Sequence, residues 1–167
     1  EFKFGGQPVL GRLMAELALA AFTEYVDGFV PADRIFVTWV PSHRAVQRER
    51  GYNQAELLAR TLVEMWPGRR ESLTCGPLIA KKVSTRHQKG LDRAARQCNL
   101  RGAFTVDERM LSSLGGDGHQ AVLLIDDVCT TGATLSEVSR VIAAVTPRPV
   151  YAFTFSRAVS GRVEGHD

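Results

Sequence analysis

Apolar residues in the first part of the chain recur at the spacings of regular secondary structure. The apolar run from Ile35 to Val40, stopped by Pro41, predicts a strand. A helix is expected from Gln54 to Val63, before the break at Pro67-Gly68. An earlier helical repeat over Pro8–Tyr25 predicts an amphipathic helix with an apolar face of Val9, Leu10, Leu13, Leu17, Ala20 and Ala21.

The rest of the chain alternates predicted strands and helices. We expect a short strand over 78–80, a short helix over 91–99, and a turn at 115–118 that leads into a strand over 121–125. A last strand is expected over 150–155. Before it, a helix opening at Leu135 would be closed by Pro147 and Pro149, with an apolar face of Leu135, Val138, Val141, Ile142 and Val145. This alternation predicts an α/β fold, a mostly parallel central sheet with helices on both faces.

Composition narrows the class of protein. With 167 residues, 44% hydrophobic and 23% charged, we expect a single domain over 1–167 whose first 30 residues or so form a helical region. Three cysteines without C-x-x-C spacing argue against a disulfide framework or a zinc site and suit a reducing cytoplasm. No apolar run approaches the roughly 18 residues that cross a bilayer, and Arg12 and Glu16 interrupt any leader-like segment.

The most informative segment is 122–135. Four apolar residues precede Asp126 and Asp127, and Thr130-Thr131-Gly132-Ala133-Thr134 then leads into the next helix. Carboxylates suit sugar hydroxyls, and successive backbone N–H groups at a helix start suit a phosphate. Acids at a strand end and Thr or Gly at a helix cap are also ordinary structural features. The sequence lacks a G-x-x-x-x-G-K-[ST] loop, which argues against the common nucleotide triphosphatases.

This segment resembles the phosphoribosyl-diphosphate (PRPP) signature of type I phosphoribosyltransferases, four apolar residues followed by D-D and T-T-G-x-T. The resemblance implies that fold. It also implies that Asp126 and Asp127 bind the ribose hydroxyls, directly or through Mg²⁺. Thr130, Thr131, Gly132, Ala133 and Thr134 would then hold the 5′-phosphate.

Two further blocks resemble the competence-associated ComF family, which includes GntX-like proteins. One is Val40-Pro41-Ser42-His43-Arg44 followed by Arg48-Glu49-Arg50-Gly51-Tyr52-Asn53-Gln54-Ala55-Glu56-Leu57-Leu58-Ala59. The other runs from Thr85 through Gln88, Leu91, Arg96 and Asn99 to Gly102-Ala103-Phe104. The family usually begins with a four-cysteine zinc module, which this sequence does not contain, and Trp39 stands where the family commonly has a proline.

The same resemblance assigns two loops. Ser42, His43 and Arg44 would bind pyrophosphate, whereas Arg48, Arg50 and Asn53 would buttress that loop or contact a neighbouring subunit. A flexible loop would place Lys82, Arg86 and Gln88 over the substrate. The basic run over 81–101 can instead be a solvated surface or a non-specific contact with DNA, although it holds no aromatic residue to stack on bases.

The resemblance therefore implies a Mg²⁺-dependent, cytoplasmic phosphoribosyltransferase that acts on PRPP and an unidentified acceptor, and an association with natural competence. The alternative is a non-catalytic PRPP sensor or adaptor in the DNA uptake, transformation or repair machinery, with protein partners there. No membrane association is expected.

Overall fold

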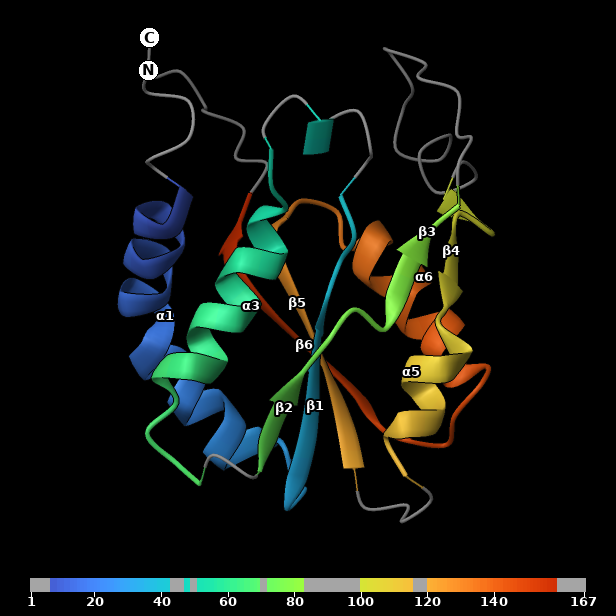
Figure 1. Ribbon diagram of the computed structural model, residues 1–167, viewed down its shortest axis with the longest axis horizontal. Coiled ribbons are helices and arrows are strands. Elements are labelled where there is room, and N and C mark those ends of the chain that lie inside the picture. Colours follow the sequence, from blue (N-terminus) through green and yellow to red (C-terminus); the bar gives the residue numbers. More distant parts are fainter. Residues whose placement is uncertain are drawn as a thin grey trace, which may run out of the picture.

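A parallel sheet forms the centre of the fold. The computed structural model describes residues 7–42, 47–48, 51–69, 72–82, 100–115 and 120–158. Four of its strands are β1 (Arg34–Trp39), β2 (Leu73–Cys75), β5 (Gln120–Cys129) and β6 (Val150–Arg157). They form one sheet in the order β2-β1-β5-β6, and every neighbouring pair is parallel. Helices lie on both sides of this sheet (Figure 1), so the predicted α/β architecture is confirmed.

Two long helices, α1 (Gln7–Phe29) and α3 (Gln54–Met65), cover one face of the sheet. The side chains of β1 and β5 alternate in direction, so that Val37 and Ile125 contribute to the core on this face. Phe22 of α1 is fully buried, and its ring packs edge-on against Phe153 of β6. The predicted helices over 8–25 and 54–63 are thereby confirmed, each extended by a few residues.

The buried face of α1 differs from the prediction. Val9, Leu13 and Leu17, expected to face the core, have exposed fractions of 67%, 51% and 69%. The opposite face is the one that packs inward, because small and aromatic side chains fit the space over α3 and β6. Its buried residues are Ala15, Ala18, Phe22 and Val26.

The other face carries α5 (Glu108–Ser113), α6 (Ala133–Ala143) and an antiparallel ribbon of β3 (Ile79–Lys81) with β4 (Phe104–Val106). A second core fills the space beneath them, and Leu78, Val122, Leu124 and Ile142 are fully buried there. The short strand predicted over 78–80 therefore exists one residue later, in this ribbon. The helix predicted over 91–99 lies outside the described residues, as do 116–118 of the predicted turn.

None of the helices in the described ranges has both the length and the hydropathy that crossing a membrane requires.

Candidate functional site

The acidic pair lies where β5 extends beyond its neighbour β1. The two strands are paired up to Trp39 and Ile125, after which β5 continues beside β6 alone, with Asp126 opposite Thr154. The prediction ended this strand at residue 125, but pairing with the longer β6 carries it to Cys129. Asp126 and Asp127 thus leave the core at the carboxyl edge of β1, which is the edge where ligands bind in parallel sheets.

The two carboxylates belong to opposite faces of the sheet, because side chains alternate along a strand. Asp126 has the parity of buried Leu124, on the α6 side, and Asp127 that of buried Ile125, on the α3 side. The backbone N–H of Asp127 donates to Asp126 Oδ1 at 3.0 Å. Burial, and then the charge of Asp127, raise the pKa of Asp126 to about 7. A bound cation or hydroxyl donor at this pair would relieve that electrostatic cost.

The segment after β5 forms the start of α6 through a glycine turn. Gly132 is the N-cap residue and has φ of +76°, a left-handed conformation that favours glycine. Its Cβ position is empty, with nothing within 4 Å, so the backbone is open to close approach. The helix begins at Ala133, not at Leu135 as predicted, because the cap residue comes immediately before it. This turn connects β5 to α6 in the upper half of the view in Figure 1.

The electrostatics of this turn suit an anion. Thr130 and Thr131 are exposed, and the Thr131 hydroxyl accepts a hydrogen bond from the Ala133 N–H at 3.3 Å. The first turn of α6 contains no acidic residue, and Gly132 supplies no side-chain cap. Helix geometry leaves the N–H groups of the first turn without intrahelical acceptors. The predicted residues Thr130, Thr131, Gly132, Ala133 and Thr134 are therefore gathered at one helix N-terminus.

The loop predicted to bind pyrophosphate starts at the same edge of the sheet. Ser42 is partly buried, and its hydroxyl has no hydrogen-bond partner among the residues that the structure describes. A buried hydroxyl without a partner is uncommon and is a natural contact for a ligand. His43 and Arg44 lie outside the described residues.

The predicted basic loop leaves from the β3–β4 ribbon. Lys82 is exposed directly after β3, and its backbone N–H donates to the carbonyl of Ala103 at 2.8 Å. Burial lowers the pKa of the preceding Lys81. Arg86 and Gln88 lie outside the described residues. The structure therefore places Lys82 at the stem of the loop and leaves the other two assignments as predictions.

Three buried polar residues support this edge, and of these only Asn53 was predicted from its motif to do so. Thr38 of β1 is fully buried, and its hydroxyl accepts a hydrogen bond from the Leu78 N–H at 3.2 Å. Asn53 donates to the carbonyl of Val40, directly after β1. Glu137 of α6 accepts from the N–H of Gly102, directly after the basic run over 81–101. A single Thr, Asn or Glu carries no periodic signal, although the Asn directly before the second helix is a recognisable N-cap.

Metal binding by protein side chains alone is not indicated in the described ranges. They contain no cluster of three or more His, Cys, Asp or Glu side chains arranged around a common point. The acidic pair offers two carboxylates and no more. This set fits Mg²⁺, which retains several waters and is completed by oxygen atoms of a phosphorylated substrate.

Comparison with known proteins identifies the class. No protein-family model matches the chain. Among solved structures, hypoxanthine phosphoribosyltransferase of Trypanosoma cruzi superposes with a TM-score of 0.50 at 12% identity, covering 96% of this chain and 71% of that one. The fold is therefore that of the type I phosphoribosyltransferases.

The chain is 29% identical over 157 residues to competence protein F of Haemophilus influenzae, an alignment that covers 94% of this chain. The chain spans only 65% of that relative's length. This similarity confirms the resemblance to the ComF family that the motifs indicate, and the chain has a phosphoribosyltransferase fold.

Proposed function

We propose that the chain binds PRPP together with Mg²⁺ and transfers its phosphoribosyl group to an acceptor, with release of pyrophosphate. One observation carries the proposal. A single strand–turn–helix unit presents two carboxylates at Asp126 and Asp127 and then an open glycine turn at a helix start without acidic residues. The carboxylates match the hydroxyls of a ribose, and the turn matches a phosphate dianion.

Each group has a defined role in this reaction. Asp126 and Asp127 accept hydrogen bonds from the ribose hydroxyls, and the turn around Gly132 holds the 5′-phosphate. The bond between the anomeric carbon and the pyrophosphate oxygen breaks, and both electrons leave with pyrophosphate. The acceptor's lone pair forms the new bond to that carbon, and its proton passes to solvent. Such a reaction needs positioning and charge stabilisation and no protein nucleophile.

Mg²⁺ fits the site through its donor set. The two carboxylates, one of them with its pKa raised by burial and by its neighbour, present oxygen ligands that a hard divalent cation favours. Bound with PRPP, the ion would neutralise charge on the departing pyrophosphate. Further hydrogen-bond donors would lie at the pyrophosphate end of the substrate. They would come from Ser42 and Lys82 and from the predicted residues His43, Arg44, Arg86 and Gln88.

The cellular role is proposed from similarity. The Haemophilus relative is named a competence protein, and we propose that this chain likewise acts in DNA uptake or transformation, with protein partners from that machinery and at most non-specific DNA contact. Cys75 and Cys129 are free thiols, which suits the cytoplasm.

Two measurements test the proposal. Isothermal titration with PRPP and Mg²⁺ should show saturable binding that an Asp126→Asn/Asp127→Asn variant loses. Incubation with a panel of bases and amines should release pyrophosphate for at least one acceptor. Binding without release across the panel would instead identify a PRPP sensor or adaptor. If the wild-type protein does not bind PRPP at millimolar concentration, both the enzyme and the sensor hypotheses are refuted.

A further inference from the structure

The loop at the end of β1 is held by one buried side chain. We propose that Asn53 is a positioning residue that fixes the segment Val40–Ser42 relative to the acidic pair and thereby favours ligands that carry pyrophosphate. The proposal rests on the proposed function, because it concerns the pyrophosphate end of the same site. It adds a residue for which the motifs suggested only a general supporting role.

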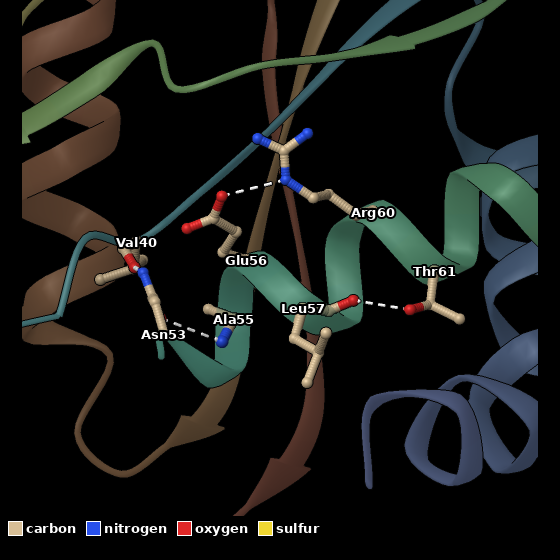
Figure 2. A network of polar contacts seen from close by, with 7 residues as sticks. All are labelled: Val40, Asn53, Ala55, Glu56, Leu57, Arg60 and Thr61. Carbon is tan, nitrogen blue, oxygen red and sulfur yellow. Dashed lines mark hydrogen bonds and ion pairs between the residues drawn. The ribbon is translucent and has the colours of Figure 1, made fainter. Parts of the chain in front are cut away.

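The contact itself is short and buried. Asn53 is 8% exposed, and its Nδ2 donates to the carbonyl oxygen of Val40 at 3.0 Å. Figure 2 shows the Asn53 side chain reaching from the start of α3 to the end of β1. Residues 40 and 53 are thus joined directly by this hydrogen bond.

The backbone of Val40 also connects Asn53 to the acidic pair, Asp126 and Asp127. The N–H of Val40 donates to the carbonyl of Ile125 at 2.9 Å, and Ile125 immediately precedes Asp126. The peptide groups on the two sides of Val40 are therefore fixed, one by β5 and the other by Asn53. Through this chain of two hydrogen bonds, Asn53 sets the position of Ser42 relative to the ribose-binding carboxylates.

Ser42 is the residue of this segment that can contact the pyrophosphate of a ligand. Its hydroxyl is buried two residues after Val40 and has no partner in the described part of the chain. The 5′-phosphate turn stands on another element, the N-terminus of α6. Loss of the Val40 contact should therefore disturb the pyrophosphate end of the site and leave the 5′-phosphate end intact.

The positioning role can be separated from a capping role. Asn53 Oδ1 also accepts a hydrogen bond from the Ala55 N–H at 3.1 Å and so caps α3. Ser and Asp are equally good caps because they supply an acceptor oxygen. Neither supplies the amide donor that reaches Val40. Asn53→Ser and Asn53→Asp therefore keep the cap and remove the clamp.

The experiment compares two ligands by isothermal titration. PRPP with Mg²⁺ contacts both ends of the site, whereas ribose 5-phosphate lacks the pyrophosphate. In Asn53→Ser and Asn53→Asp we expect affinity for PRPP to fall about tenfold or more, as for a lost buried hydrogen bond, and affinity for ribose 5-phosphate to stay within about twofold. Asp107→Ser is the matched control, because Asp107 caps α5 through its own side chain and lies outside the site.

The results distinguish a positioning role of Asn53 from a capping role and from a general disturbance of the site. Unchanged affinity for both ligands would show that Asn53 is only a cap, and an equal loss for both would show a general disturbance; either overturns the proposal. If Asn53→Ser does not fold, Asn53→Asp carries the comparison. A wild-type protein that binds neither ligand would refute the proposed function itself, a failure visible before any variant is made.

Discussion

The carboxylate of Glu137, in α6, accepts a hydrogen bond from the backbone N–H of Gly102 at 3.0 Å. Arg140, one turn later, donates to both oxygens of the same carboxylate at 2.9 and 2.8 Å. The helix that begins at the phosphate turn is thereby joined to the chain just before β4. Two segments that the proposed reaction needs, the 5′-phosphate turn and the stem of the basic loop, share this one carboxylate.

Replacing Glu137 should change how the stability of the protein depends on pH. The hydrogen bonds from Arg140, assisted by the Gly102 N–H, lower the pKa of Glu137 to about 2. A lowered carboxyl pKa gives stability that is complete above about pH 4.3, where an unfolded Glu is ionised, and that is lost as the pH falls toward 2. We expect Glu137→Gln to lower the melting temperature at pH 7 by about 2–4 °C and to reduce the loss of stability below pH 4.

Glu16 provides the control for that comparison. Its ion pair with Arg12 is also within one helix, at 2.9 Å, but both side chains are well exposed. Exposed pairs of this kind contribute little, so Glu16→Gln should change the melting temperature by no more than about 1–2 °C. Equal effects of the two variants would show that the charge of the buried Glu137 carboxylate contributes no more than that of an exposed one.

Gly132→Ala should separate phosphate binding from folding. A non-glycine residue at φ +76° costs about 1 kcal/mol, and the added Cβ meets no atom of the protein within 4 Å. It would instead occupy the space through which a phosphate approaches the backbone. We expect a folded protein whose affinity for ribose 5-phosphate, measured by titration, is at least about tenfold weaker. Gly115→Ala, with φ +73° and equally open space, should have the same folding cost and full affinity.

The acidic pair should make the ligand-free protein less stable as the pH rises. Asp126 has a pKa of about 7 in the folded chain, against about 3.9 when unfolded. The folded state therefore holds an extra proton between these values, and stability decreases from about pH 4 to pH 7 and then levels off. Asp126→Asn should remove this dependence. Urea unfolding at pH 5 and pH 8 measures it, and a wild-type protein equally stable at both would contradict the raised pKa.

Thr38→Val tests the buried contact beneath the site. The substitution keeps the shape of the side chain and removes the hydroxyl acceptor of the Leu78 N–H, which keeps the Gly76 carbonyl as an acceptor at 3.0 Å; Thr38 and Leu78 are both fully buried. A buried hydrogen bond contributes about 0.5–1.5 kcal/mol, so the free energy of unfolding should fall by about that amount. Hydrogen exchange of the Leu78 amide should accelerate beyond that of Ala144, which is bonded within α6. Equal acceleration at both amides would point to a merely global effect.

The long elements could be predicted from sequence because their patterns are strong. The continuous apolar run before Asp126 is long enough to predict β5. The helical repeats of apolar residues predict the long helices. β2 and β4 are three residues each, too short for alternation to appear, and their pairing partners are distant in sequence. The six-residue α5 was also missed, although its N-cap Asp107, bonded to two backbone N–H groups, left a local signal.

The site divides in the same way. The acidic pair and the glycine turn are contiguous in sequence, so one motif was enough to predict that they lie together, and their ligands stay a prediction. The contacts of Asn53 with Val40 and of Glu137 with Gly102 depend on how separate elements pack, and no local pattern encodes that packing. The face of α1 was predicted wrongly for a related reason: both sides of this helix carry apolar residues, and only the rest of the fold decides which side is covered.

The alternating directions of side chains along β5 have a consequence for its length. One residue inserted or deleted between Ala121 and Asp127 would reverse the directions of the strand's remaining side chains, moving aliphatic groups from one core into the other and exchanging the faces of the two carboxylates. Relatives that keep the acidic pair can therefore differ in composition along the segment, but their alignments should contain no gap there.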